Sequence, residues 1–390
     1  MFALFIAPFD FDLSTSTYAW VVHKAVERLS SRIALVSSND YWSSADDIIR
    51  ASQTIPTNSQ YDYLVSRNLK VGDFESLIKL DIDKRRFSEN HLALSRSKSL
   101  SIIQDELDEY LFSEVCDRIE ALPSLKAGLM WSNCETIRGA CEKYGIPTIF
   151  NEMGPLRPPN YHPAAYMDFG GLHHRNTATE RFERFKTSCT GSSIEIMELE
   201  KLIYLLRSRN PEPCRSSAKY TGIALQSPGY SSLKYSNGFT NYCLIHLAQQ
   251  KFSGTMLVRP HPGQAEIYPR PGLLYDDGQT PDNFISKIYQ LITVNSGIAF
   301  EALLAGKPTY LIGESPIKYG TWDLSTLSPK IWDDELIVWL NWFAFGYLIP
   351  FQFLFDGDYY DWRLTYPSET EIYDRNIEWW KKHGGPRSAT

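Results

Sequence analysis

The sequence predicts an α/β protein with two parallel-sheet domains that face each other across a cleft. Apolar runs typical of buried strands alternate with amphipathic helical segments along most of the chain. This alternation stops at a polar stretch with two prolines, residues 210–218, and then begins again. The 390 residues and their 43% hydrophobic content are enough for two domains, each with its own core.

The first half of the chain contains two β-α-β patterns. Residues 2–7 and 32–36 are expected strands on either side of a helix at 18–29. Residues 127–151 form a compact second unit of strand, helix and strand, which leads into a loop at 154–175 rich in Pro, Gly and His. Loops that follow the carboxyl ends of strands are where α/β proteins bind ligands.

The second half repeats the pattern. We expect strands at 220–226, 255–259, 273–276, 291–295 and 308–312, and helices at 239–251, 283–289, 297–304 and 371–382. The expected domains are therefore an acceptor-side domain at 1–212, a ligand-binding domain at 213–365, and a C-terminal helix at 366–390 that packs back on the first domain.

Composition excludes several classes of protein. The net charge of −7 argues against a broad nucleic-acid surface, so we expect no nucleic-acid partner. The six cysteines are scattered without a CxxC pair, which argues against a zinc cluster and favours reduced thiols. No secretory signal precedes the first expected strand, and we expect a cytoplasmic protein.

Residues 336–355 carry no charged side chain and are long enough to span a bilayer. They contain Asn341, Pro350 and Gln352, and acidic residues flank them on both sides, which is the wrong sign for a membrane anchor. We expect this segment to be buried in the protein, with contact at the inner face of a membrane as the alternative.

Two basic side chains follow the expected strand at 255–259. Arg259 and His261 alternate with Pro260 and Pro262, which hold the chain extended. A guanidinium is a fork of donors suited to phosphate, and an imidazole can donate to a phosphate oxygen or assist a leaving group. The alternative is a turn whose histidine makes only a structural hydrogen bond.

A second motif lies at the next helix start. Asn295, Ser296 and Gly297 precede the helix at 297–304, and free amides at a helix start attract an anion. Ser296 adds a hydroxyl, or serves only as a cap. Glu301 lies one turn further along, where a carboxylate could accept the two hydroxyls of a ribose; the alternative is a solvated charge on the helix.

Glu152 is the candidate catalytic acid or base, because it follows the expected strand at 147–151 and precedes Gly154 and Pro155. Carboxylates usually fill this role in glycosidic chemistry. The alternative is a loop residue that caps the next helix.

Four further residues are candidates for the cleft or the acceptor. Gln226 ends an expected strand, and His162 lies in the loop after Glu152. Asp10 and Asp12 form an Asp-x-Asp pattern after the first expected strand. This pattern matches by chance too easily to indicate a metal, and we expect no metal and no cofactor.

The order Arg-Pro-His-Pro, then Asn-Ser-Gly-(x)3-Glu-Ala-Leu-(x)2-Gly-Lys-Pro, resembles the bacterial capsule-polysaccharide biosynthesis proteins, among them the β-Kdo transferases. It is more distantly similar to the bacterial sialyltransferases. The resemblance covers roughly 127–154 and 220–313. It implies a GT-B fold of two Rossmann-like domains and transfer of Kdo or a related acidic sugar from a CMP donor to a capsule or O-antigen glycan, without a metal.

In this resemblance, His261 and Ser296 bind the CMP phosphate, with the amide of Gly297, and Glu152 is the catalytic carboxylate. Retaining members of the family place an acidic nucleophile in a loop that corresponds to 227–232, which holds no carboxylate here. Retention or inversion therefore stays open. Three alternatives for the function also stay open. They are a transferase with a UDP- or GDP-sugar donor, an isomerase such as a UDP-sugar 2-epimerase, and a non-catalytic sugar-nucleotide binder.

Overall fold

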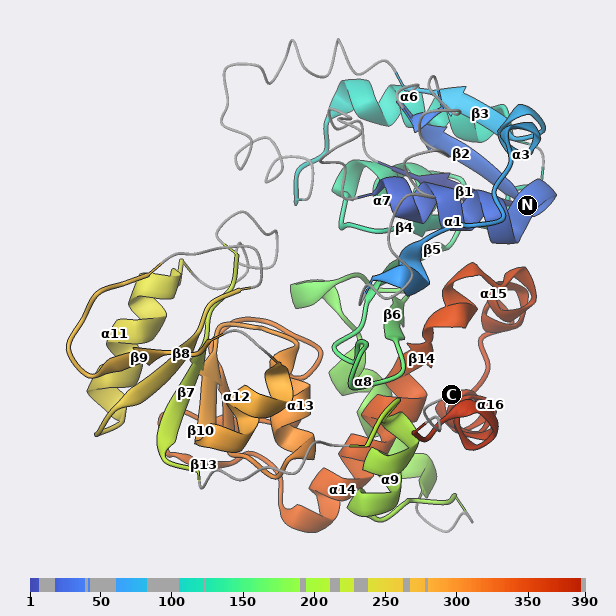
Figure 1. Ribbon diagram of the computed structural model, residues 1–390. Helices are drawn as coiled ribbons and strands as arrows, with labels where there is room; N and C mark the ends of the chain where they lie inside the picture. The colour runs from blue at the N-terminus through green and yellow to red at the C-terminus, as the bar shows by residue number, and fades with distance from the viewer. Residues whose placement is uncertain are drawn as a thin grey trace. The chain divides into compact units, whose positions relative to one another are not determined.

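The computed structural model describes residues 1–6, 18–38, 41–42, 61–82, 105–122, 124–189, 194–210, 218–227, 238–261, 267–277 and 280–386. Two seven-stranded sheets with flanking helices form the framework (Figure 1), with strand orders β14-β6-β5-β4-β1-β2-β3 and β13-β12-β11-β10-β7-β8-β9. The α/β class predicted from the sequence is confirmed.

The chain divides into two compact units that interleave along the sequence. Unit 1 contains Met1–Glu152, Met167–Leu172 and Phe351–Tyr366; unit 2 contains Met153–Tyr166, His173–Pro350 and Pro367–Thr390. The sequence predicts linear domains at 1–212 and 213–365 instead. The difference arises because the helices before residue 210 bury apolar side chains, among them Phe182 and Leu206, in the same core as Trp339.

Unit 1 is built on five strands whose described pairs are parallel. They are β1 (Phe2–Phe5), β2 (Ile33–Ser37), β3 (Ile78–Asp81), β4 (Ala127–Met130) and β5 (Thr148–Met153). One sheet face, with Ala3 and Phe5, packs on Leu111 of α6 (Glu109–Glu120) and Ile137 of α7 (Glu135–Lys143). Helix α1 (Ala19–Leu29) contacts β2 and the short α3 (Val71–Glu75).

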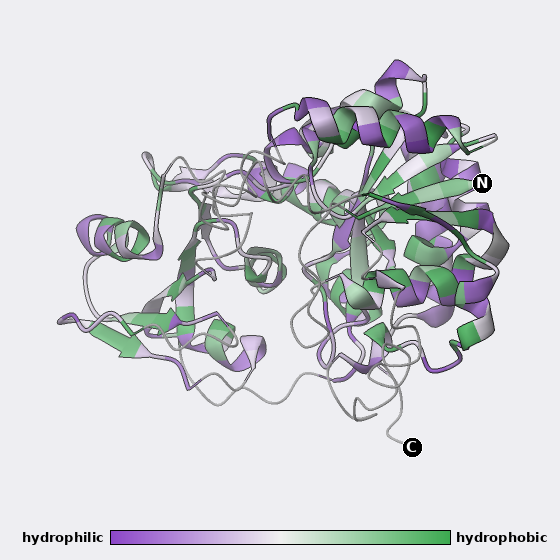
Figure 2. Cartoon of the chain, turned by 90° about the horizontal axis from the view of Figure 1, so that it is seen from above, coloured by the Kyte–Doolittle hydropathy of each residue, from purple (hydrophilic) through white to green (hydrophobic). Residues whose placement is uncertain are grey.

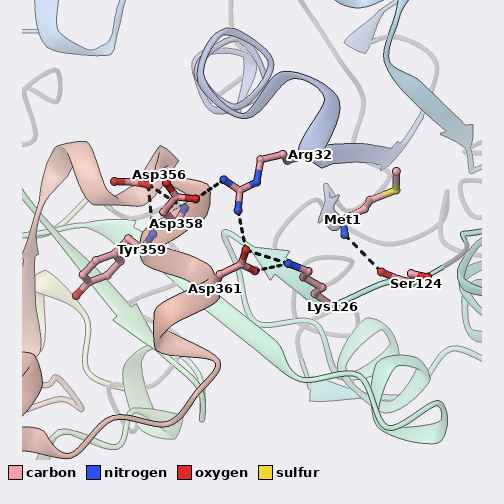
Figure 3. A network of polar contacts seen from close by, with 8 residues as sticks. All are labelled: Met1, Arg32, Ser124, Lys126, Asp356, Asp358, Tyr359 and Asp361. Carbon is pink, nitrogen blue, oxygen red and sulfur yellow. Dashed lines mark hydrogen bonds and ion pairs between the residues drawn. The ribbon is translucent and has the colours of Figure 1, made fainter.

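Helix α15 (Gly357–Arg363) is held to residues at the amino ends of the unit 1 strands (Figure 3). Arg32, directly before β2, donates to Asp358 and to Asp361, with N–O distances of 2.7 Å each. Lys126, directly before β4, donates to both oxygens of Asp361 at 2.8 and 2.9 Å. These exposed ion pairs lie at the edge of the sheet opposite to the carboxyl end of β5, and so away from Glu152.

Unit 2 contains the second sheet, with α11 (Asn241–Lys251) on one face and α12 (Pro281–Lys287) and α13 (Ile298–Leu304) on the other. Its strands are β7 (Tyr220–Ala224), β8 (Met256–Arg259), β9 (Leu273–Tyr275), β10 (Ile288–Thr293), β11 (Thr309–Leu311), β12 (Trp322–Asp323) and β13 (Ser328–Pro329). The pairing is parallel except between β12 and β13. Apolar strands and amphipathic helices are visible in Figure 2.

Residues 336–350 of the uncharged segment belong to unit 2 and contribute to its helical core, and residues 351–355 belong to unit 1. Most of the segment is buried, as predicted. It forms most of α14 (Asp333–Trp342), a π-helical turn at Phe343–Tyr347 and strand β14 (Leu348–Pro350), which pairs antiparallel with β6 (Ala164–Asp168). Residues 339–351 are all buried. No helix in the described part of the chain is both long and apolar enough to cross a membrane.

The C-terminal helix α16 (Glu369–His383) contacts α8 (Ala178–Cys189), α9 (Leu199–Leu206) and the π-helical turn. Its first residue, Glu369, forms a buried ion pair with Arg181 of α8 at 2.9 Å. The sequence predicts that this helix packs on residues 1–212, and α8 and α9 fall within that range. Both helices nevertheless belong to unit 2.

His23 makes the stability of unit 1 sensitive to acid. Its ring is buried on α1 against Phe74, and burial lowers its pKa from 6.5 to about 4. Between these values the unfolded chain binds a proton that the folded chain does not. The free energy of unfolding therefore falls as the pH drops from 6.5 to 4, by about 3 kcal/mol in total.

We expect His23→Leu to remove this slope, measured by urea unfolding at pH 7, 5.5 and 4.5. His246→Leu, at an exposed position of α11, is the matched control and should keep it. An unchanged slope in His23→Leu contradicts a neutral buried ring.

Candidate functional site

Three neighbouring strands of unit 2 end at the same level. Thr293 of β10 is the register partner of Ala224 of β7, and Ala224 is the partner of Arg259 of β8. The hydroxyl of Thr293 donates to the carbonyl of Ala224 at 2.8 Å. Because the strands are parallel, the residues that follow them leave the sheet along one edge, where α/β proteins bind ligands. Gln226, His261 and the stretch from Asn295 to Gly297 are these residues.

Two of the predicted site residues are in direct contact. The side-chain amide of Gln226 donates to the Oδ1 of Asn295 at 3.0 Å. The backbone of Gln226 is fixed by Asn241 at the start of α11, which accepts from its N–H at 3.0 Å and donates to its carbonyl at 2.7 Å. Sequence analysis did not identify Asn241, because its role depends on a contact with a residue 15 positions earlier in the chain.

Arg259 lies at the expected strand end, but its guanidinium is paired with a protein carboxylate. It forms an ion pair with Asp276, whose side chain is fully buried and also meets Lys287 at 3.3 Å. Arg259 itself is 8% exposed. The guanidinium of Arg259 therefore does not have all its donors available for phosphate, contrary to what the sequence analysis expected. Arg259 and Lys287 share the carboxylate of Asp276, so the three side chains together keep a positive charge. Binding of a donor by Arg259 stays a prediction.

Ser296 and Gly297 precede α13 as predicted, and Ser296 is partly exposed. The N-cap residue is Gly297, and no side chain caps the helix, so Ser296 is not needed as a cap. A Cβ at Gly297 would lie 3.2 Å from Pro155, so the missing side chain allows a close approach of the loop after β5.

Glu301 is buried and not a solvated helix charge, since only 7% of the residue is exposed. Burial raises the pKa of its carboxyl to about 8, and the nearby Asp282 raises it further, whereas Arg207, Arg259 and Arg157 lower it. Glu301 is thus mostly a neutral carboxylic acid at pH 7, although three guanidinium groups lie in its surroundings.

Two of these arginines are held by other groups of unit 2. Arg207, directly after α9, forms a two-point ion pair with Asp282 at 2.6 and 3.2 Å and lies over the ring of Tyr161 at 4.8 Å. Arg157 donates to the carbonyl of Gly154 at 3.0 Å. Sequence analysis missed both residues. Arg207 meets a partner 75 residues away, and Arg157 comes near Glu301 only through the tertiary structure.

Glu152 lies on β5 of unit 1 and is partly exposed. The strand continues to Met153, beyond the expected end at 151, because its neighbour in the sheet is β6, which the sequence analysis treated as loop. Glu152 interacts electrostatically with Tyr18 at the start of α1. Its catalytic role stays a prediction.

The remaining candidates lie in different environments. His261 is partly exposed, two residues after β8. His162 is buried in unit 2, where its Nε2 lies 2.9 Å from the carbonyl oxygen of Gly385, so little of its ring is open to an acceptor. Asp10 and Asp12 lie outside the described residues, as does most of the loop at 227–232.

The second sheet thus carries a polar edge at the ends of three parallel strands, which is where α/β proteins of this architecture bind ligands. Residues 4–180, somewhat less than half of the chain, match the model of the Glycosyltransferase 99 family N-terminal domain. This match confirms the predicted resemblance to a glycosyltransferase family. No curated protein matches the chain.

Among solved structures, the chain is similar to two KpsC enzymes of Thermosulfurimonas dismutans. The beta Kdo 2,7 transferase is 19% identical, with 68% of this chain and 88% of that chain covered and a TM-score of 0.43. The beta Kdo 2,4 transferase is 18% identical, with 58% and 81% covered and a TM-score of 0.39. A UDP-GlcNAc 2-epimerase of Methanocaldococcus jannaschii is 8% identical, with 81% and 85% covered and a TM-score of 0.31.

The raised pKa of Glu301 predicts that ionisation of this residue destabilises unit 2. The carboxyl binds its proton more tightly in the folded than in the unfolded chain, so the stability that the proton provides is complete below pH 4.5 and lost as the pH rises through 8. Glu301→Gln removes this loss. We expect the variant to exceed the wild type in free energy of unfolding at pH 9.5, by at most about 5 kcal/mol, and to match it near pH 5.

The measurement is urea unfolding of both proteins at pH 5, 7 and 9.5. Glu200→Gln, at an exposed position of α9, is the control and should show no gain at any pH. A Glu301→Gln variant that is less stable at pH 9.5 would falsify the assignment of a neutral buried carboxyl.

Proposed function

We propose that the protein is a glycosyltransferase that moves Kdo or a related acidic sugar from a CMP donor to a capsule or O-antigen glycan. The observation that supports this most strongly is the common edge formed by the ends of β7, β8 and β10, with Glu301 buried behind it. The family match over 4–180 supports the class of reaction. The partners are the nucleotide-sugar donor and the glycan acceptor.

Unit 2 binds the donor in this proposal. The phosphate of CMP lies against the hydroxyl of Ser296 and the imidazole of His261, which both follow strand ends at the shared edge. Arg259 and Lys287 share one carboxylate, that of Asp276, and so leave a net positive charge near the phosphate. As the sugar leaves CMP, His261 donates a hydrogen bond or a proton to the departing phosphate oxygen.

Glu301 recognises the ribose. A carboxylate accepts hydrogen bonds from two neighbouring hydroxyls at once, and a buried site makes these bonds stronger than in water. The ionised form accepts both bonds, so ribose binding favours loss of the proton from Glu301. Donor affinity should therefore rise with pH up to about 8, where the free carboxyl titrates.

Unit 1 provides the base. Glu152 takes the proton from an acceptor hydroxyl, the oxygen attacks the anomeric carbon of the donor sugar, and the bond from that carbon to the CMP phosphate breaks. This inverting course needs one carboxylate. A retaining course needs a second carboxylate as nucleophile, from a residue other than those of the loop at 227–232. No step uses a metal.

Donor binding is tested by calorimetric titration with CMP between pH 6 and pH 9. We expect the affinity of the wild type to rise over this range and Glu301→Gln to weaken binding at pH 8 by roughly tenfold, with a flatter pH dependence. Glu200→Gln should behave like the wild type. CMP that binds equally well to wild type and Glu301→Gln contradicts the ribose assignment. Binding of UMP or UDP in place of CMP would indicate a UDP-sugar enzyme, either a transferase or an epimerase.

Catalysis by Glu152 is tested with CMP-Kdo by following release of CMP. We expect Glu152→Gln to lower the rate of transfer by roughly 100-fold or more, because general base catalysis typically contributes that much. CMP affinity should stay unchanged, since Glu152 does not belong to the donor unit. Transfer at the wild-type rate would rule Glu152 out as the base.

A further inference from the structure

Unit 1 holds a cluster of aromatic rings that the donor chemistry does not use. Trp20, in the first turn of α1, lies 5.0 Å from Trp131, 6.1 Å from Phe351 and 6.2 Å from Phe355, measured between ring centroids. Tyr63 packs edge-on against Phe351 at 4.9 Å. Trp131, Phe351 and Phe355 are buried, whereas Trp20 and Tyr63 are partly exposed. The cluster therefore supports two rings that solvent can reach.

The cluster lies at the carboxyl edge of the unit 1 sheet. Trp131 and Ser132 directly follow β4, and α1 is the next described element after β1. Strands β1, β4 and β5 are parallel, so their carboxyl ends share one edge with Glu152 near the end of β5. The rings and the candidate base are thus on the same side of one sheet.

One hydroxyl near the rings in the sequence is within electrostatic range of Glu152. The hydroxyl of Tyr18, two residues before Trp20, is hydrogen-bonded to the side chain of Ser132 and lies within electrostatic range of Tyr41 and Glu152. Burial raises the pKa of Tyr18 to about 12, although the residue as a whole is partly exposed. A tyrosine hydroxyl is protonated at neutral pH with or without this shift and can donate a hydrogen bond. Partly exposed aromatic rings beside a small number of polar groups are typical of ligand sites.

We propose that Trp20 and Tyr18 form the acceptor subsite, with the face of one pyranose ring stacked on Trp20 and a sugar hydroxyl hydrogen-bonded to Tyr18 beside Glu152. A pyranose carries C–H groups on its faces and hydroxyls around its rim, which matches an indole face next to hydroxyl donors. This inference rests on the proposed transferase function and adds the residues that select and orient the acceptor.

A lipid or protein partner fits this place less well. Among the described residues, two rings of the cluster are partly exposed, and the groups that act on nearby Tyr18 are the hydroxyls of Ser132 and Tyr41 and the carboxylate of Glu152. An extended apolar partner would leave these polar groups without hydrogen bonds to water or ligand, at a cost in free energy. A single sugar ring satisfies both the apolar and the polar part.

The test uses the full chain and two separate probes. The first probe is CMP, whose binding is measured by calorimetry. The second is a panel of methyl glycosides of galactose, N-acetylglucosamine, rhamnose and Kdo at millimolar concentration, whose binding is detected by saturation-transfer NMR. We expect at least one glycoside to bind the wild type, and Trp20→Ala to weaken it at least tenfold with CMP affinity unchanged.

Two further variants separate recognition from folding. Trp20→Phe keeps a ring in the cluster and should lose less affinity than Trp20→Ala, and Tyr18→Phe removes only the hydroxyl and should weaken binding severalfold. The matched controls are Trp332→Ala, at a tryptophan that is 78% exposed, and Tyr204→Phe, at a tyrosine that is 59% exposed; neither should change glycoside binding. Thermal melting identifies any variant that has lost its fold.

The outcomes distinguish the two proposals. Loss of CMP binding in the wild type overturns the proposed function, whatever the glycosides do. Normal CMP binding with no bound glycoside overturns the acceptor subsite. The acceptor subsite is also overturned if Tyr18→Phe and Trp20→Phe both fold and both bind the glycoside as the wild type does. The rings would then only stabilise the fold.

Discussion

The register of β10, β7 and β8 is the constraint on which the proposed donor site depends. Thr293, Ala224 and Arg259 are level across the three strands, and the hydroxyl of Thr293 fixes this level by its bond to the carbonyl of Ala224. A shift of one residue in β10 would turn its buried side chains to the other face of the sheet. It would also move Asn295 out of reach of Gln226. The polar edge is therefore a consequence of how the apolar strands pack.

Three acidic side chains of unit 2 avoid an unpaired buried charge in two different ways. Asp276 and Asp282 are each paired with an arginine, whereas Glu301 forms no ion pair with any described residue and is instead kept neutral by burial. Replacing a buried ion pair by a neutral group is often tolerated, but an unpaired buried charge is costly. A carboxyl whose proton leaves when a ligand arrives avoids that cost in the free protein. The proposed role in ribose binding favours ionised Glu301, whereas the stability of the free protein favours the neutral form.

Much of the sheet framework could be predicted because parallel strands are buried on both faces and appear as continuous apolar runs. Expected strands at 220–226, 255–259 and 291–295 overlap β7, β8 and β10, and the helix at 297–304 is α13 to within one residue. Strands β6 and β14 were missed, since they are short and pair with each other across about 180 residues of sequence. Arg259 was placed correctly, but its pairing with Asp276 depends on tertiary structure. For the same reason the sequence showed Trp20 and Trp131 as isolated aromatic residues.

A crystal structure of the complex with CMP tests the account most directly. We expect the ribose hydroxyls within hydrogen-bond distance of Glu301, and the phosphate beside Ser296 and His261 at the shared ends of β8 and β10. CMP bound at another place, with Glu301 still buried and in contact with protein alone, would contradict the assignment of this edge as the donor site.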